Sequence, residues 1–149
     1  MSTKSRSFIL SGLLFVLSGC AVYHGGSFVS ADLPPNKSQL MVEKVVERLV
    51  AVYPPGRTAL CLDLIKSDFF GRELESKLRT QGFKLLPSQH GQNALLLTYT
   101  VDSLEDDKEA LLWYVRIRLS DGFSFAQVYD LGDTPKALGG MTQIIPAGD

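Results

Sequence analysis

The amino-acid sequence predicts an α+β fold, a two-layer sandwich in which a mixed sheet of about five strands carries two helices on one face. Residues 39–53 and 69–81 place apolar side chains at helical spacing, and five further segments have the alternation or apolar composition of strands. A strand-helix-strand unit over residues 58–86 favours a right-handed crossover between parallel strands. Together these observations predict one small domain.

The first helix is expected over residues 39–53, with Ser38 as its N-cap. Its apolar stripe consists of Leu40, Val42, Val45, Val46, Leu49 and Val50. Because valine is a weak helix former, packing against a sheet must stabilise this helix. The run Pro54-Pro55-Gly56 ends it.

The strand-helix-strand unit begins with residues 58–65, where Leu60, Leu62 and Leu64 share one face. Ser67-Asp68 offers an N-cap for the helix over residues 69–81. The buried stripe of this helix should be Phe70, Leu74 and Leu78.

On the outer face of this helix, Glu73 and Lys77 are spaced for an ion pair, as are Glu75 and Arg79. Gly82 is suited to follow the helix in the left-handed conformation, and residues 83–86 should return as a short strand.

Three longer strands are expected over residues 94–103, 110–120 and 123–131. In the middle strand apolar and polar side chains alternate, which indicates one buried and one solvated face. The apolar face holds Trp113, Val115, Ile117 and Leu119, and the other face holds Tyr114, Arg116 and Arg118. Asp121-Gly122 is a strong signal for a hairpin turn between the last two strands.

The N-terminus resembles the signal peptide of a bacterial lipoprotein over residues 1–19. Lys4 and Arg6 precede an apolar run over residues 8–17, which is shorter than the roughly 20 residues that span a bilayer. The run ends in Leu17-Ser18-Gly19-Cys20, which is similar to the lipobox. The alternatives are an ordinary signal peptide and a buried helix with a chance cysteine.

The lipobox resemblance implies a diacylglycerol on the Cys20 sulfur, cleavage before Cys20 and acylation of the new amino terminus. Two or more acyl chains give stable anchoring, whereas one gives only marginal binding. With Ala21 after the cysteine, the resemblance implies the periplasmic face of the outer membrane.

Residues 20–37 contain Gly25-Gly26 and Pro34-Pro35 without periodicity, and they are interpreted as a flexible tether between the lipid and a domain over residues 38–131. The Gly- and Pro-rich tail over residues 132–149 is either disordered or adds an edge strand to this domain or to a partner. Without Lys4 and Arg6 the chain has 13 basic and 16 acidic residues and no basic block, which argues against direct nucleic-acid binding.

The sequence offers little catalytic chemistry. His24 in the tether and His90 in a loop lack the spacing of metal ligands, and no phosphate-binding loop or nucleophile elbow occurs. Asp63 and Asp102 could form a carboxylate pair, but nothing brings them together in the pattern. We therefore expect no catalytic residue, no metal, no small-molecule substrate and no cofactor other than the lipid on Cys20.

Two smaller features have simple structural explanations. The acidic residues of segment 105–109 lack the spacing of a calcium loop and are expected to form a solvated turn. Cys61 has no partner if Cys20 carries lipid, and its apolar neighbours predict a buried, inert thiol; a reactive or cross-linking thiol is the alternative.

Tyr114, Arg116 and Arg118 are the candidate interaction face, because tyrosine and arginine are enriched at protein interfaces. The alternative is a plain solvated sheet face.

The order and spacing of several stretches resemble the TrbH family of conjugal-transfer lipoproteins. They are the lipobox, "FFGRELESKLRTQGFKLL", "LLLTYTVDSL", "VRIRLSDGFSFAQVYDL" and a tail with Pro135 and Gly139-Gly140-Met141-Thr142. Family members often have an arginine before the late tyrosine, and here the stretch is Ala126-Gln127-Val128-Tyr129.

The resemblance implies a non-enzymatic outer-membrane lipoprotein that helps to assemble or stabilise the envelope channel of a type IV secretion apparatus, with other channel proteins as partners. Two other classes remain open. One is a lipoprotein adaptor or activator for cell-wall synthesis or outer-membrane assembly, and the other is a periplasmic enzyme.

Overall fold

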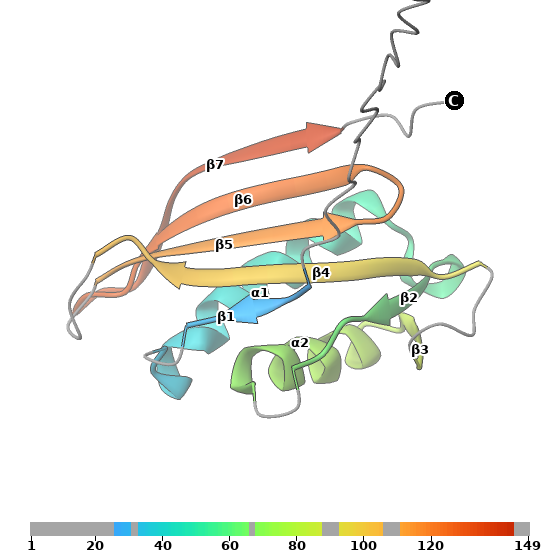
Figure 1. The fold of residues 1–149 in the computed structure, drawn as a ribbon, viewed down its shortest axis with the longest axis horizontal. Coiled ribbons are helices and arrows are strands. Elements are labelled where there is room, and N and C mark those ends of the chain that lie inside the picture. Colours follow the sequence, from blue (N-terminus) through green and yellow to red (C-terminus); the bar gives the residue numbers. More distant parts are fainter. Residues whose placement is uncertain (1–25, 31–32, 66–67, 88–92, 106–110, 145–149) are drawn as a thin grey trace, which may run out of the picture.

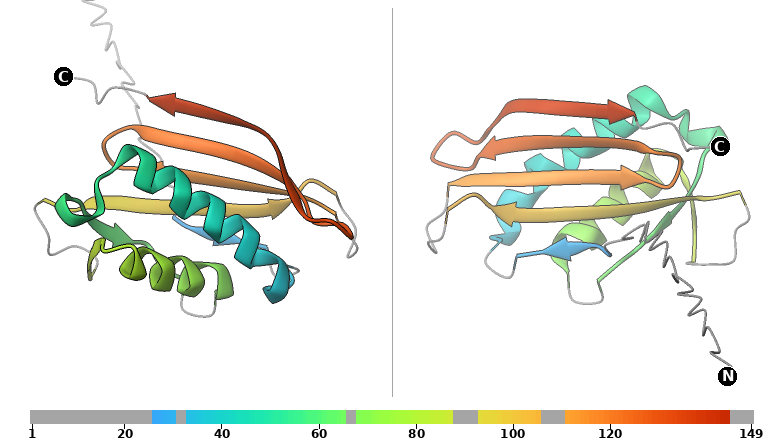
Figure 2. Two further views of the ribbon diagram at one scale, coloured as in Figure 1. Left: turned by 180° about the vertical axis from the view of Figure 1, so that it is seen from behind. Right: turned by 45° about the horizontal axis from the view of Figure 1, so that its top comes forward.

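The computed structural model describes residues 26–30, 33–65, 68–87, 93–105 and 111–144. The expected signal peptide, Cys20, His24, His90 and most of the acidic turn lie outside the described residues. Within them, a mixed sheet carries two helices on one side (Figures 1 and 2), which confirms the predicted α+β sandwich.

The described chain forms two α-helices, one 3-10 helix and seven strands. In chain order they are β1 (Phe28–Val29), α1 (Pro35–Val52), η1 (Pro55–Arg57), β2 (Ala59–Leu62), α2 (Phe69–Thr80), β3 (Lys84–Leu86), β4 (Leu95–Ser103), β5 (Leu112–Leu119), β6 (Phe123–Asp130) and β7 (Lys136–Ile144).

Strand β4 is the centre of the sheet, whose order is β3-β2-β4-β5-β6-β7. One edge of β4 pairs antiparallel with β5. Its other edge is shared by two short parallel strands, because β2 pairs with residues 95–97 and β1 pairs with residues 100–101. Strand β2 ends where the chain turns toward α2, and β1 pairs with the part of the β4 edge that β2 does not reach.

The sheet is wider than the predicted five strands, because segments on both sides of residues 38–131 add to it. Strand β1 comes from the segment expected to be a tether, and its two residues are too few to show a periodicity. Strand β7 comes from the Gly- and Pro-rich tail and pairs antiparallel with β6. Of the alternatives for the tail, the structure has an edge strand in this domain.

Helix α1 begins earlier than predicted, and Ser38 is not its N-cap. Pro34 is the N-cap residue and Pro35 occupies the first turn, where its fixed φ suits a helix and its missing N–H costs nothing. Ser38 lies inside the helix, fully buried, and its hydroxyl donates to the Pro35 carbonyl at 2.8 Å. The helix buries Met41, Val42, Val45, Val46 and Leu49, whereas the predicted Leu40 and Val50 are only partly buried.

Helix α2 follows the prediction closely. Its N-cap is Asp68, whose two carboxylate oxygens accept from the N–H groups of Phe70 and Gly71 at 2.8 and 2.9 Å. The stripe of Phe70, Leu74 and Leu78 is fully buried, as predicted. Gly82 has a φ of 91°, which fits the expected left-handed residue after the helix.

Of the two ion pairs expected on α2, one occurs. Arg79 contacts Glu75 at 2.6 Å, but Lys77 reaches Glu43 of α1 at 3.6 Å rather than Glu73. Because the two helices lie side by side, a partner on the other helix competes with one on the same helix.

The core lies between the helices and the odd-numbered side of β4, β5 and β6. Tyr99, Val101, Trp113, Val115, Ile117 and Tyr129 have exposed fractions of 2% or less. The predicted apolar face of β5 is thus confirmed. Cys61 is buried and unpaired, with an exposed fraction of 7%.

The side chain and backbone of Tyr99 link three segments that are distant in sequence. Its hydroxyl donates to Asp68 at 2.6 Å, and its N–H donates to the hydroxyl of Ser27 at 3.2 Å. The N–H of Ser27 donates to Asp63 at 2.8 Å. We call these four residues, Ser27, Asp63, Asp68 and Tyr99, the Tyr99 junction. Burial, followed by the hydrogen bond and charge of Asp68, raises the pKa of Tyr99 above its ordinary value.

Gly71 is required by this junction, and its replacement tests the packing. A methyl group at position 71 would overlap the Tyr99 hydroxyl and lie 2.6 Å from the Asp68 carboxylate. We expect Gly71→Ala to lower the free energy of unfolding by about 1–3 kcal/mol in urea denaturation. Gly56→Ala is the control, because a methyl group there meets nothing, and it should change stability by less than about 0.5 kcal/mol. Equal effects of the two substitutions would contradict the structure.

Tyr99 and Tyr129 form a matched pair for measuring what a buried hydroxyl contributes. Tyr99 donates to a carboxylate, whereas the buried Tyr129 hydroxyl has no hydrogen-bond partner within the described residues. Tyr99→Phe should therefore lower the free energy of unfolding by about 1.5–3 kcal/mol, and Tyr129→Phe should leave it unchanged or raise it by about 1 kcal/mol. A loss at Tyr129 as large as that at Tyr99 would show that its hydroxyl is bonded.

The substitution Tyr129→Phe should also change how the free energy of unfolding depends on pH above pH 10. Burial, and then the charge of Glu47, raises the pKa of Tyr129 in the folded state above the unfolded value of about 10. The contribution of its neutral form is therefore complete below pH 10 and is lost as the pH rises further, because only the unfolded state ionises. We expect Tyr129→Phe to reduce the loss of stability by up to about 1.4 kcal/mol per pH unit above 10. Unfolding curves between about pH 9 and 11 measure this, and parallel pH profiles of variant and wild type would refute it.

Candidate functional site

The sheet face opposite the helices is not covered by any described element (Figures 1 and 2). We call it the open face. The strand register places five side chains in one row across it, from β1 through β4, β5 and β6 to β7: Phe28, Thr100, Arg116, Ala126 and Met141. The row thus extends over five strands, from β1 to β7.

The three residues of the predicted interaction face lie on this surface. Tyr114, Arg116 and Arg118 occupy successive outward positions of β5 and are each partly exposed. Their register partners on β4 are Asp102, Thr100 and Thr98, which leave the middle of the face polar. Among the described residues, the side chains of Arg116 and Arg118 have no hydrogen bond or ion pair, so their charges are available to a partner.

Two exposed apolar side chains, which sequence reasoning did not assign to this face, flank these cations. Phe28 is 50% exposed on β1, and Met141 is 72% exposed on β7. The segment of Phe28 was expected to be a tether, and an edge strand of this domain was only one of the alternatives for the tail of Met141, so neither residue could be placed on a sheet face. The only available signal was the small apolar patch that Met141 begins in the tail.

The acidic groups of the open face lie at its margins. Asp102 is close to the end of β4 and accepts from the N–H of Ser103 at 2.9 Å. Asp130 lies 3.8 Å from Lys136 of β7. The two arginines therefore occupy a positive centre, between a phenylalanine and a methionine at the two edges, which is suited to a partner with acidic and apolar groups.

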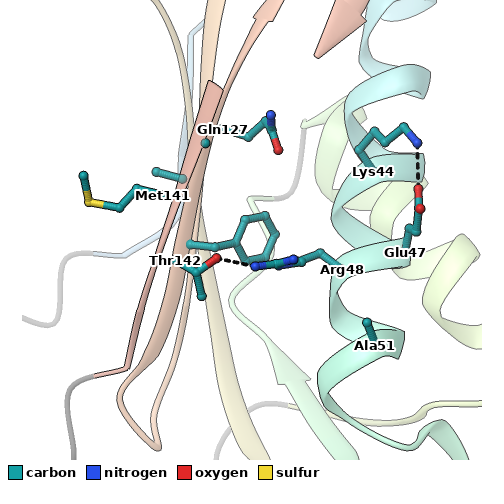
Figure 3. Close-up of a pocket in the computed structure, with 10 residues that line it drawn as sticks. Lys44, Glu47, Arg48, Ala51, Gln127, Met141 and Thr142 are labelled. Carbon is teal, nitrogen blue, oxygen red and sulfur yellow. Dashed lines mark hydrogen bonds and ion pairs between the residues drawn. The ribbon is translucent and has the colours of Figure 1, made fainter. Parts of the chain in front are cut away.

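On the other side of the sheet, a cavity of about 340 Å³ separates α1 from β6 and β7 (Figure 3). Two of its charged groups bind each other, since Lys44 contacts Glu47 at 2.7 Å, whereas Arg48 donates to the neutral Thr142 hydroxyl at 2.6 Å. The hydrogen bond and charge of Glu47 raise the pKa of Lys44. Figure 3 shows Arg48 reaching from the helix to β7, while Met141 points away from the helix. We interpret the hydrogen bond between Arg48 and Thr142 as an additional link between β7 and the domain.

The carboxylates considered for catalysis do not share a site. Asp63 belongs to the Tyr99 junction, where it accepts from Ser27, whereas Asp102 lies on the open face. Within the described ranges, no group of three or more His, Cys, Asp or Glu residues could hold a metal ion. Nor does any helix in this part of the chain have the length and apolarity needed to span a membrane.

Comparison with known proteins gives a match to a protein family. No curated protein and no solved structure matches the chain. The family described as conjugal transfer protein TrbH matches residues 23–148, a range that contains both α-helices and all seven strands. The chain therefore belongs to the TrbH family of conjugal transfer proteins.

Proposed function

We propose that this protein is a non-enzymatic lipoprotein of a conjugative type IV secretion apparatus. In this proposal a lipid on Cys20 anchors it to the periplasmic face of the outer membrane, and the open face binds another protein of the envelope channel. The observation that carries the proposal is the family match over residues 23–148.

The open face supports a binding role. Its row of exposed Phe28, Arg116 and Met141, with Tyr114 and Arg118 beside it, has the residue types that are enriched at protein interfaces. The helices already cover the opposite face, and in the cavity there Lys44 is paired with Glu47 while Arg48 is hydrogen-bonded to Thr142. The arrangement suits an adaptor that is held at a membrane and presents one flat surface to a partner.

The anchor is supported by the first twenty residues. A positively charged start, a short apolar run and Leu17-Ser18-Gly19-Cys20 follow one another in the order of a lipoprotein signal. A stable lipid anchor requires no membrane-spanning helix elsewhere in the chain. Partner binding would therefore take place in the periplasm, beside the outer membrane.

Charge reversal on the open face tests the binding surface. A strain that lacks the gene is complemented with wild type, Arg116→Glu or Arg57→Glu, and transfer of DNA to recipient cells is counted. Arg57→Glu is the matched control, because Arg57 is exposed in η1, away from the open face. We expect Arg116→Glu to lower transfer about tenfold or more, because a central interface arginine contributes more than about 1.4 kcal/mol.

Both variants should fold with stabilities within about 0.5 kcal/mol of wild type, because both sites are on the surface. Normal transfer by Arg116→Glu would refute the open face as the binding surface. Normal transfer by the strain without the gene would refute the role in conjugation altogether.

Crosslinking identifies the partner. The tagged protein is recovered from crosslinked cell envelopes, and the attached proteins are identified by mass spectrometry, with Cys20→Ala as the unlipidated control. We expect subunits of the conjugation channel from the wild type and a strongly reduced yield from the control. Recovery of cell-wall synthases or outer-membrane assembly proteins instead would support the alternative adaptor function.

A further inference from the structure

Strand β7 forms one edge of the sheet, and within the described residues no strand pairs with its outer side (Figures 1 and 2). It is nine residues long, and every residue from Lys136 to Gln143 is exposed. Proteins commonly protect such an edge with charged side chains, proline or a bulge. Strand β7 has one charged residue, Lys136 at its start, and no proline. Its irregular register is confined to the first half, so residues 140–144 form a regular edge that can accept a further strand.

The strand ladder shows which backbone groups of this edge are free. In antiparallel sheets, a residue whose N–H and C=O groups bond one neighbouring strand does not bond the other, and the two directions alternate along the strand. The N–H of Leu131 donates to the Leu111 carbonyl at 2.7 Å, so odd-numbered residues of β6 bond β5 and even-numbered ones bond β7. Met141 and Gln143 are the partners of even-numbered residues. The backbone groups that point away from the sheet are therefore those of Gly140, Thr142 and Ile144.

The helix side of the same edge carries a cation without an acidic partner. Arg48 of α1 donates to the Thr142 hydroxyl at 2.6 Å, and Figure 3 shows its side chain extended toward β7. Among the described residues Arg48 forms no ion pair. Lys44 also lines the cavity between α1 and β7, and it contacts Glu47 at 2.7 Å. With two cations and one carboxylate, the cavity has an excess positive charge at Arg48.

A strand added to β7 would bring a side chain to Arg48. Directly opposite residues of an antiparallel pair have Cβ atoms about 4.5–5.5 Å apart on the same side of the sheet. The residue opposite Thr142 therefore lies on the helix side, next to the guanidinium that binds Thr142. A carboxylate in this position would neutralise Arg48. The residue opposite Met141 lies on the open face instead, beside a side chain that is 72% exposed, and an apolar group there would cover it.

We propose that β7 pairs with an extended segment of the protein partner, which adds a strand to the sheet. The segment has an acidic residue opposite Thr142, toward the helices, and an apolar residue opposite Met141, toward the open face. This inference deepens the proposed function, because it specifies how the partner of the open face binds. In such strand addition, main-chain hydrogen bonds give affinity and alternate side chains give specificity.

A second copy of the chain fits this edge less well than an acidic segment does. Strand β7 contains no aspartate or glutamate, so a pair of β7 strands would give Arg48 no carboxylate. The pairing would also bring a second Lys44 and a second Arg48 to the same side of the extended sheet. Like charges placed together disfavour association.

Substitutions at Thr142 separate the outer edge of β7 from the rest of the fold. Thr142→Pro removes an N–H that points away from β6, a position at which an edge strand tolerates proline. Thr142→Val is the matched control, because it also lacks the hydroxyl that Arg48 binds but keeps the N–H. Both variants should unfold near the urea concentration of the wild type. We expect Thr142→Pro to lower DNA transfer about tenfold or more, while Thr142→Val stays within about threefold of wild type.

Crosslinking in intact donor cells reads the pairing without relying on the fold of the proline variant. The photoreactive residue p-benzoylphenylalanine replaces Met141 or Gln143, with Arg57 on the surface of η1 as the control position, and the crosslinked peptides are sequenced by mass spectrometry. We expect positions 141 and 143 to crosslink to one partner segment, at residues two apart, with an aspartate or glutamate between them. Replacing that acid by lysine should lower transfer, and combining it with Arg48→Glu should restore it.

The outcomes distinguish strand addition from the proposed function on which it builds. Crosslinks from β7 to β7 of another copy would assign the edge to self-association and overturn the inference. Crosslinks that are absent, scattered or without an acid between them would overturn it as well. Normal transfer by a folded Thr142→Pro, together with reduced transfer by Arg116→Glu, would refute strand addition and leave the open face as the binding surface. Normal transfer by the strain without the gene would refute both.

Discussion

The hydrogen bond from the Tyr99 hydroxyl to Asp68 is the contact on which the arrangement of the domain depends. It joins the central strand β4 to the N-cap of α2, and the backbone of the same tyrosine binds Ser27 of the incoming chain. Because Asp68 also accepts from two N–H groups of α2, one carboxylate sets the start of the helix and its position against the sheet. A charged acceptor in a buried site makes such a bond stronger than most, and its loss leaves a carboxylate short of donors.

The order in which strands pair explains how one face of the sheet remains open. Strand β2 leaves the edge of β4 after Leu62, and β1 pairs with the same edge three residues later along β4. The chain therefore enters the fold in the middle of the sheet, between two short strands, while both helices pack on the other side. At the opposite edge, β7 pairs with β6 and is also hydrogen-bonded to Arg48 of α1, and Met141 extends the open face by one more strand. The open face therefore has arginines at its centre and apolar side chains at both edges.

The pattern within single elements could be predicted from sequence. The alternation of Trp113 with Tyr114 gave the correct faces of β5, and Phe70, Leu74 and Leu78 gave the buried stripe of α2. The predictions were wrong where a residue outside the local pattern changes the structure. Ser38 has the right chemistry for an N-cap, but Pro35 starts the helix before it. Lys77 is correctly spaced for Glu73, but Glu43 of the neighbouring helix binds it instead. The cations Arg116 and Arg118 were found from sequence, whereas Phe28 and Met141 were not, because they belong to short or Gly-rich strands without a periodic signal.

The sequence by itself determined the fold class and the apolar faces of the long elements, because these depend on local spacing and on residue type. Tertiary structure decided which flanking segments belong to the sheet and how much chain is left between Cys20 and the domain. A two-residue strand such as β1 has almost no intrinsic preference and forms only because β4 offers an unpaired edge and Asp63 an acceptor for Ser27. That pairing leaves at most the residues between Cys20 and Ser27 as a possible tether, which no property of residues 20–37 taken alone could have shown.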